Sequence, residues 1–333
     1  MNITAARYSQ ERLSMRKNAM KEMQRRTREI DFLRCVLILL MITFHIVYIG
    51  DTYDVAKRVV YTFHMPAFLM VSGYLCNTSK DGRVFFRSMK WIFIPYLVME
   101  TGYVLMASVL PIREHIDTLT PALMLDKLFL HPLGPYWYLH TWVLCSVIYF
   151  LAMRLTRLRP ALRLVFAVAG CLLFAAAGLM SVPNVLYFMA GAVLRQTGVS
   201  FLAAFRPAWW SILPVVPIVV FMPSQLDRAT PGGIAMVYLT TSFILYIYRF
   251  TRGSVRRSLL FVGSNTLLLL LFSPVFTALS KLYLSLFISF DPSGILFCMV
   301  TVTMAVVGSF LLGYASDRLH ISPLFFGKEK VFR

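Results

Sequence analysis

The strongest constraint on the fold is a series of ten apolar runs, most of them near the 20 residues that carry a helix across a bilayer. The runs cover residues 30–49, 57–76, 91–111, 136–153, 162–180, 183–195, 208–222, 232–250, 259–281 and 294–315. Only 14% of the residues are charged, about half the fraction in soluble domains, which excludes that class. The pattern predicts an all-α, polytopic integral membrane protein with about ten transmembrane helices. The weakest runs are 183–195, which is short, and 208–222, which contains two prolines.

The distribution of basic residues predicts which loops face the cytoplasm. Of the 33 Lys and Arg residues, 26 lie in the two terminal segments and every second loop, six lie in the intervening loops, and Arg34 lies within the first run. Because Lys and Arg are retained on the cytoplasmic side during insertion, both termini are expected there. The predicted organisation is a basic arm over residues 1–29, a ten-helix domain over 30–315 and a tail over 316–333.

The net charge of +18 follows this alternation of loops, so the expected partner is the lipid bilayer and not nucleic acid. The basic arm is longer than the start of a secretory signal, which favours a retained first helix. The five cysteines lie in or beside apolar runs without metal-ligand spacing, so packing residues and no metal site are expected. Homo-oligomer formation is left open.

Ionisable residues in an apolar run are costly, which makes Asp31, Arg34 and His45 candidate functional residues. Asp31 precedes Arg34 by one turn and can pair with it. Arg34 and His45 are eleven residues apart, so a helix places them on one face about 16 Å apart. We expect both to line one aqueous pocket, with His45 as a base, because its ordinary pKa of about 6.5 suits proton transfer. The alternative is an interfacial ion pair and a histidine that only packs.

The second run carries His64 at a depth similar to that of His45, so the two imidazoles are expected to share a cavity. Pro66 follows His64 and frees a backbone carbonyl. Ser72 and Gly73 allow a ligand or a neighbouring helix to approach closely. A kinked helix with a packed seam of small residues is the alternative.

Three charged residues mark the third run and the loop before it. Arg87 and Lys90 are one turn apart at its cytoplasmic start, where they suit either an anionic ligand or anchoring in anionic lipid. Glu100 is about ten residues into the run, and an acid at that depth is neutral, paired or in contact with water.

A long external loop over about 112–135 leads into the fourth run and is expected to cover a site from outside. The run opens with Trp137 and Tyr138, which are typical of an interfacial aromatic belt. His140 follows them and is expected to face the cavity of His45.

These motifs resemble membrane acyltransferase family 3, the bacterial integral-membrane O-acyltransferases that modify cell-surface glycans. The matching positions are Asp31-Phe32-Leu33-Arg34 with His45, Phe68 to Leu75, Arg87-Ser88-Met89-Lys90 followed by Pro95-Tyr96, and Trp137-Tyr138-Leu139. Two departures stand out: Lys90 replaces an arginine, and Leu270 and Ser273 stand where a late tyrosine and histidine are common. Any role of that late histidine is therefore absent, or taken by His64 or His140.

The resemblance implies an acyl-CoA donor, acetyl-CoA in the simplest case, a glycan hydroxyl as acceptor and a multi-pass protein of the bacterial inner membrane. No permanently bound cofactor is expected. The expected catalytic residues are His45, as base or transient acyl carrier, Arg34, and Asp31, which orients it. The expected donor contacts are Arg87, Lys90, Ser72 and Tyr74. The expected acceptor contacts are His64, Glu100, Trp137, Tyr138 and His140. The acceptor sugar, the acyl chain length and the side of transfer are not set by the sequence.

Two rival functions come from other classes. In a proton-coupled exporter of a sugar or lipid-linked glycan, Glu100, His45 and His64 would relay protons, but the sequence has no matched pair of broken helices in two related halves. A non-enzymatic assembly subunit would tolerate the loss of Arg34 and His45 together.

Overall fold

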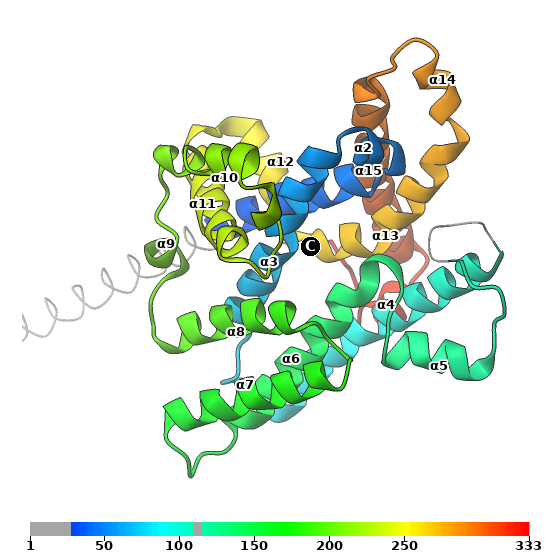
Figure 1. The fold of residues 1–333 in the computed structure, drawn as a ribbon. Coiled ribbons are helices and arrows are strands. Elements are labelled where there is room, and N and C mark those ends of the chain that lie inside the picture. Colours follow the sequence, from blue (N-terminus) through cyan, green and yellow to red (C-terminus); the bar gives the residue numbers. More distant parts are fainter. Residues whose placement is uncertain (1–27, 110–114, 333) are drawn as a thin grey trace, which may run out of the picture.

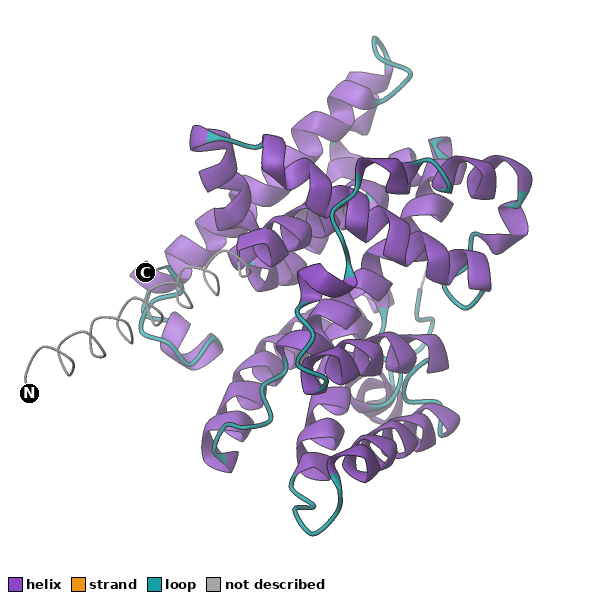
Figure 2. Cartoon of the chain, turned by 90° about the vertical axis from the view of Figure 1, so that its left-hand side faces the viewer, coloured by secondary structure: helices purple, strands orange, loops and turns teal. Residues whose placement is uncertain are grey.

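The computed structural model describes residues 28–109 and 115–332. Within these ranges the chain consists of helices and loops, without a strand (Figure 2). The prediction for the basic arm over 1–29 falls almost entirely outside the described residues. The prediction of an all-helical chain is confirmed for the part that the structure describes.

The apolar runs correspond to a chain of helices that includes short 3-10 segments. They are the helix over residues 28–45, α2 (Val47–Thr52), α3 (Asp54–Leu75), α4 (Gly82–Val109), α5 (Pro121–Phe129), η1 (Gly134–Tyr136), α6 (Trp137–Met153), α7 (Pro160–Ala176), α8 (Val182–Gln196), α9 (Phe201–Ala204), η2 (Trp209–Ile212), α10 (Val215–Phe221), η3 (Pro223–Gln225), α11 (Pro231–Ile247), η4 (Tyr248–Phe250), α12 (Gly253–Ser264), α13 (Thr266–Leu279), η5 (Ser280–Leu282), α14 (Leu284–Ile288), α15 (Ile295–Arg318) and α16 (Ser322–Phe325). Each predicted run therefore overlaps between one and three helical elements.

Four helical segments in the described ranges are long and apolar enough to cross a membrane. They are Gly82–Val109, Gly134–Met153, Pro231–Phe250 and Ile295–Arg318. The pair Gly253–Ser264 and Thr266–Leu282 is a fifth candidate, with a bend of 84° between its halves. A polytopic membrane protein fits this set, whereas the count of ten crossings and the side of each terminus stay predictions. The apolar segments over 160–176 and 209–221 are shorter.

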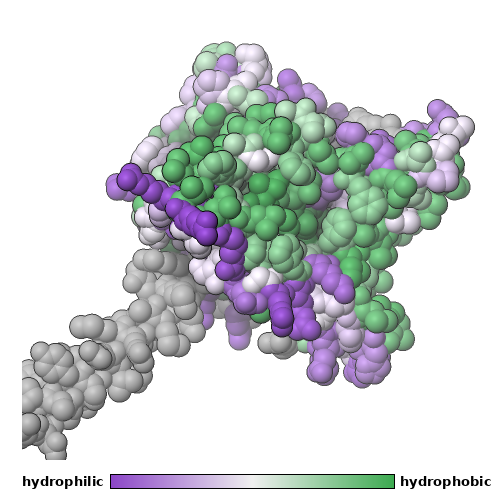
Figure 3. Space-filling model, turned by 90° about the horizontal axis from the view of Figure 1, so that it is seen from below, coloured by the Kyte–Doolittle hydropathy of each residue, from purple (hydrophilic) through white to green (hydrophobic). Residues whose placement is uncertain are grey.

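The surface of the molecule agrees with a membrane environment. Figure 3 shows apolar side chains spread across the middle of one face, with hydrophilic side chains along its lower edge. Exposed large side chains on α4 and α15, such as Val98, Leu105 and Leu311, contribute to the apolar surface. Such extended exposure of apolar groups favours contact with lipid over contact with water.

Helix α3 lies at the centre of the packing, between α8 and α11, and it also contacts α6 (Figure 1). Its seam with α8 is formed by glycines: a Cβ on Gly73 would overlap the backbone oxygen of Phe188, and a Cβ on Gly191 would overlap that of Met70. The Ser72-Gly73 pair of the sequence therefore includes a helix-packing glycine, as the packed-seam alternative proposed. Close backbone approach at small residues is a common way of packing helices in membranes.

Two local features depart from the expected elements. The first apolar run is interrupted at Ile46, where the backbone is extended between the helix over 28–45 and α2. The external loop contains helix α5, which begins at Pro121 behind the capping side chain of Thr120. Both features shape the pocket described next, because His45 is the last residue before the break and Leu130 follows α5 directly.

Candidate active site

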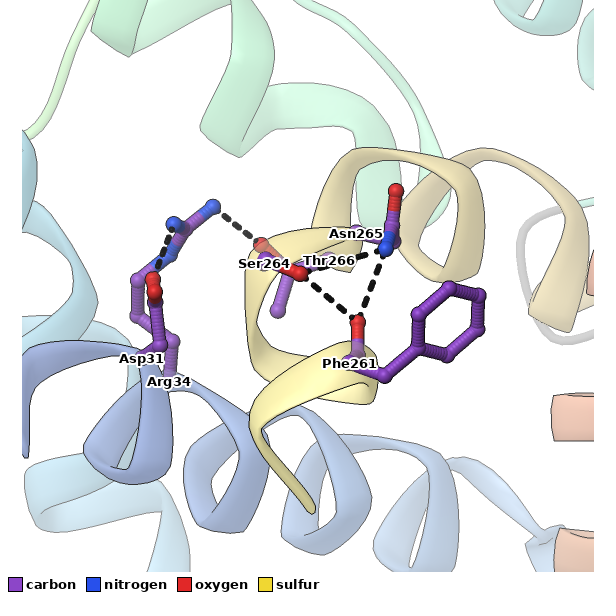
Figure 4. Close-up of polar contacts among 6 residues, drawn as sticks. All are labelled: Asp31, Arg34, Phe261, Ser264, Asn265 and Thr266. Atoms are coloured by element: carbon purple, nitrogen blue, oxygen red, sulfur yellow. Dashed lines mark hydrogen bonds and ion pairs between the residues drawn. The ribbon is translucent and has the colours of Figure 1, made fainter. Parts of the chain in front are cut away.

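Arg34 is held between two helices. Its Nη1 donates to the Asp31 carboxylate at 3.2 Å, and its Nη2 donates to the Thr266 hydroxyl at 2.6 Å. Figure 4 shows the guanidinium between these two side chains. The side chains of Arg34 and Asp31 are 24% and 18% exposed, so the ion pair is partly screened from water. The predicted pairing of Asp31 with Arg34 is confirmed, and Thr266 is an additional partner.

The fold brings Thr266 to Arg34 through a close helix contact and a break. A Cβ on Gly263 would overlap the backbone oxygen of Asp31, so α12 approaches the first helix as only glycine allows. The chain then bends at Asn265, whose side-chain amide donates to the Phe261 carbonyl at 2.8 Å (Figure 4). Thr266 is the first residue of α13, immediately after this bend.

Arg34 lines a cavity of about 290 Å³, which we call the Arg34 pocket. Its walls are the residues Arg34, Ile38, Phe68, Val71, Ser72, Leu75, Cys76, Asn77, Lys80, Phe85, Ser88, Met89, Ile92, Tyr138, Leu139, Trp142, Ser146, Thr266, Leu267 and Leu270. Among these described residues, two are cations and none is a carboxylate. The Ser72 and Tyr138 hydroxyls are hydrogen-bonded at 2.6 Å across the wall. The pocket thus combines apolar sides with positive charge.

His45 lines a different cavity, of about 710 Å³, which we call the histidine pocket. Its walls are the residues His45, Asp54, Lys57, Arg58, Tyr61, Thr62, His64, Met65, Leu130, His131, Pro132, Trp137, His140, Thr141, Gly178, Leu179, Met180, Ser181, Asn184, Leu226, Asp227 and Arg228. His45 and His64 both line this cavity, in agreement with the prediction that they share one. His140 also lines it, as expected. Residues 130–132 of the external loop also line the cavity, which agrees with the expectation that this loop covers a site.

The hydrogen bonds of the imidazoles fix which ring nitrogen carries the proton. Nδ1 of His45 contacts the Met41 carbonyl at 2.7 Å, and Nδ1 of His64 contacts the Val60 carbonyl at 2.7 Å. A carbonyl oxygen only accepts, so Nδ1 donates in both rings and Nε2 of the neutral ring keeps its lone pair. The ring of Tyr61 lies near both imidazoles, with its centroid 6.0 Å from that of His45 and 5.1 Å from that of His64. Both histidines therefore present a basic nitrogen.

The two pockets are separate, which corrects the expectation that Arg34 and His45 line one pocket. Nearby residues of α3 and α6 contribute to both pockets. Met65 and Trp137 line the histidine pocket, whereas Phe68, one turn after Met65, and Tyr138, next to Trp137, line the Arg34 pocket. The Phe68 and Tyr138 rings pack edge to face at 5.9 Å. The predicted acceptor contact Tyr138 accordingly lies in the same pocket as the predicted donor contact Ser72. Arg34 and His45 lie on one helix but line two different pockets.

Three of the predicted donor contacts do not line the Arg34 pocket. Arg87 and Lys90 are exposed on α4, on either side of the lining residues Ser88 and Met89, and the Lys90 ammonium lies 5.2 Å from the Trp91 ring centre. The Tyr74 hydroxyl accepts the backbone N–H of Phe201 at 3.3 Å, and its ring packs on the Phe201 ring. These positions place Arg87 and Lys90 beside the pocket and Tyr74 in the contact with α9.

Glu100 lies outside both pocket walls. It is fully buried, and its carboxylate accepts the backbone N–H of Leu133. This bond ties α4 to the segment that supplies Leu130, His131 and Pro132 to the histidine pocket. Glu100 therefore positions one wall of the pocket.

Sequence reasoning did not select Thr266, Asn184 or Arg228 as site residues. Thr266 belongs to the Gly263-Ser264-Asn265-Thr266-Leu267 segment, in which Gly263 and Thr266 both face the first helix at Asp31 and Arg34. The spacing of Gly263 and Thr266, three residues apart, was the sequence signal that could have identified Thr266. Asn184 in helix α8 and Arg228 in a loop carry no motif, and only tertiary packing places them in the histidine pocket.

Among the residues described, no group of three or more His, Cys, Asp or Glu side chains has an arrangement that holds a metal ion. Four of the five cysteines are buried, and all five are unbridged.

Comparison with known proteins gives one result. No curated protein and no solved structure matches the chain. A family model described as an acyltransferase domain matches residues 27–314, a range that contains Arg34, His45, Thr266 and the walls of both pockets. The chain therefore belongs to the acyltransferase family that its motifs resemble.

Proposed function

We propose that the protein transfers an acyl group, acetyl in the simplest case, from acyl-CoA to a hydroxyl group of a cell-surface polysaccharide or a lipid-linked sugar. The observation that carries this proposal is the bond from His45 Nδ1 to the Met41 carbonyl, which leaves Nε2 as the base in a polar cavity. A histidine fixed in this tautomer is suited to general base or nucleophilic catalysis of acyl transfer.

The Arg34 pocket suits the donor. Its apolar walls of Phe68, Phe85 and Trp142 fit the pantetheine arm of acyl-CoA, and its two cations attract the negatively charged CoA. Asp31 and Thr266 each hold one end of the guanidinium, so Arg34 is oriented before substrate binds. In this position Arg34 contacts the bound donor, and Arg87 and Lys90 on the neighbouring surface of α4 contact the CoA phosphates.

The histidine pocket suits the acceptor, because ring-shaped and polar groups line it together. Trp137 offers a flat apolar surface, and Thr141, Asn184 and the imidazoles of His64 and His140 offer hydrogen-bonding groups. Sites that combine aromatic walls with a few polar groups are typical of small-molecule binding. Polar groups of this kind select hydroxyl-bearing ligands because an analogue without hydroxyls would leave them unpaired.

The proposed reaction balances with His45 alone. Nε2 takes the proton of the acceptor hydroxyl as its oxygen attacks the thioester carbonyl carbon, the C–O bond forms, and the C–S bond breaks. The CoA thiolate leaves and is protonated to the free thiol, with the imidazolium returning its proton. In the two-step form, Nε2 attacks the thioester carbon and the C–S bond breaks, so that CoA leaves as the thiolate. The acceptor hydroxyl then attacks the acyl carbon, the C–N bond breaks, and the hydroxyl proton passes through the imidazole to the thiolate. Either form requires the acyl group to pass Phe68 and Tyr138 into the histidine pocket.

The alternation of basic loops assigns the two pockets to opposite sides of the membrane. Lys80 and Ser88 of the Arg34 pocket belong to the loop segment predicted to be cytoplasmic, and Lys57 and Arg228 of the histidine pocket belong to predicted external segments. On this basis the donor enters from the cytoplasm, and transfer delivers the acyl group towards the outer face of a bacterial cell membrane.

Radiolabelled acetyl-CoA incubated with the purified full chain in detergent and a membrane glycan fraction tests the proposal. The expected result is label bound covalently to glycan, with release of one CoA thiol per acyl group. A second reaction without glycan separates the two forms, since only the two-step form labels the protein. Absence of label from glycan, together with uptake of sugar by vesicles containing the protein, would favour an exporter and contradict acyl transfer.

A further inference from the structure

The charged groups of the histidine pocket are unbalanced in favour of cations. Lys57, Arg58 and Arg228 line the pocket with two carboxylates, Asp54 and Asp227. Arg58 is paired with Asp54 at 3.1 Å, which neutralises both. Lys57 lies 3.4 Å from Asp51, a carboxylate outside the pocket wall that is 54% exposed. The Lys57 side chain is 18% exposed, so Lys57 is paired like Arg58, and Arg228 is the remaining cation of the wall.

Arg228 has no ion-pair partner and donates no side-chain hydrogen bond among the described residues. Its guanidinium lies 5.8 Å from the centre of the Trp137 ring, within cation–π range. Its backbone carbonyl accepts the Tyr187 hydroxyl at 2.8 Å, which fixes the loop that carries it. The neighbouring Asp227 carboxylate accepts the backbone N–H of Ala229 at 2.7 Å. Arg228 is therefore a half-buried arginine on an anchored loop, and its guanidinium donates no hydrogen bond among the described residues.

Four buried polar atoms in the wall of the same pocket are without a hydrogen-bond partner. They are Nε2 of His64, Nδ1 of His140, Oγ of Ser181 and Oδ1 of Asn184. His64, His140 and Asn184 are each only 3% exposed. A buried polar group without a partner is destabilising by about 1–3 kcal/mol, and ligand hydroxyls in the pocket would supply the missing partners.

From these observations, and on the basis of the proposed function, we infer that the acceptor is an anionic sugar whose carboxylate or phosphate binds Arg228. The sugar ring packs on Trp137, and its hydroxyls meet the unpartnered atoms of His64 and Asn184. Arginine is well suited to this role because its planar fork of donors matches two oxygens of a carboxylate or phosphate. A neutral glycan would leave the guanidinium of Arg228 without a counter-charge.

Three soluble probes of similar size test the inference: glucose, glucuronic acid and glucose 1-phosphate. Their affinity for the purified full chain is measured by titration calorimetry at low salt. The charged probes are expected to bind at least about tenfold more tightly than glucose, as for charge-assisted hydrogen bonds. A larger gain for glucuronic acid points to an acidic sugar, and a larger gain for glucose 1-phosphate points to a phosphate-linked acceptor. Equal affinity for glucose and both charged probes, including no binding of any, overturns the inference.

Variants of Arg228 connect the charge preference to this side chain. Arg228→Gln is expected to abolish the preference, Arg228→Lys to retain part of it, and Arg157→Gln, at an exposed arginine outside both pockets, to leave it unchanged. The melting temperature of each ligand-free variant checks that it is folded. A preference that survives in Arg228→Gln contradicts the assignment.

Failure of this inference is distinguishable from failure of the proposed function. Transfer of label from acetyl-CoA to a glycan without any preference for charged probes contradicts the anionic acceptor and leaves acyl transfer standing. Absence of transfer to every glycan contradicts the proposed function itself.

Discussion

Arg34 and Thr266 are 232 residues apart in the chain, and their side chains are joined by a hydrogen bond of 2.6 Å. The bond connects the first helix to the first residue of α13, immediately after the bend at Asn265. It completes the support of a guanidinium that Asp31 holds from the other side. Because an arginine with two fixed partners retains little freedom, the substrate meets it already oriented.

Removing the hydroxyl of Thr266 tests this support. Thr266→Val keeps the shape of the side chain but loses the acceptor for Arg34 Nη2. A hydrogen bond to a charged group contributes about 1.5–3 kcal/mol, so kcat/KM for acyl transfer is expected to fall by about tenfold or more. Thr266→Ser, which keeps the hydroxyl, is the control and is expected to stay near the wild-type value. Equal kcat/KM in the valine variant and the wild type would show that the bond has no role in turnover.

The glycine seam between α3 and α8 gives a prediction about stability. In Gly73→Ala the new methyl group overlaps the backbone of Phe188, so the two helices have to separate. Overpacking of this kind is destabilising by about 1–3 kcal/mol, and a lower melting temperature in detergent is expected. Gly102→Ala is the matched control, because its methyl group meets nothing within 4 Å and alanine is the better helix former. Similar melting temperatures for the two variants would contradict the seam.

The contact between Asp126 and His131 gives a prediction about pH. His131 Nδ1 donates to the Asp126 carboxylate at 2.7 Å, and this bond, with Lys127 nearby, holds the pKa of Asp126 below its ordinary value. A depressed pKa means that the contact stabilises the loop above the ordinary pKa of about 3.9 and is lost as pH falls through the folded-state value.

Amide hydrogen exchange over residues 121–132 measures this effect. At about pH 7, Asp126→Asn is expected to exchange faster than the wild type, because the ionised contact is absent. At an acidic pH below the folded-state pKa of Asp126 the difference is expected to shrink, since protonation removes the contact in the wild type as well. A difference of the same size at both pH values would rule out titration of Asp126 as its cause.

Local features of the sequence were sufficient to predict the helices and the Asp31–Arg34 pair. The ten apolar runs overlap the helical segments because bilayer-length hydrophobic stretches and helices coincide in membrane proteins. Asp31 and Arg34 are one turn apart, and that spacing alone permits their bond. Helix α5 was not predicted, because it has only nine residues and lies in a polar loop.

The division of the site into two pockets depends on tertiary packing and was not predictable from periodicity. Helical spacing relates Arg34 to His45, but Phe68 from α3 and Tyr138 from α6 pack together in the wall of the Arg34 pocket, which does not include His45. The contact of Arg34 with Thr266 likewise depends on the approach of Gly263 to Asp31. Such long-range relations are set by how helices pack, which the spacing within one helix does not encode.

The most direct test of the account is the rate of acyl transfer by His45→Gln. Glutamine keeps a polar side chain of similar size but has no basic nitrogen, and loss of a general base lowers rates by about 10² to 10⁴. We predict at least a hundredfold loss of transfer from acetyl-CoA, about the lower bound of that range, with an unchanged melting temperature. His115→Gln, at an exposed histidine outside both pockets, is expected to keep the wild-type rate. A folded His45→Gln protein that transfers acyl groups at the wild-type rate would contradict the account.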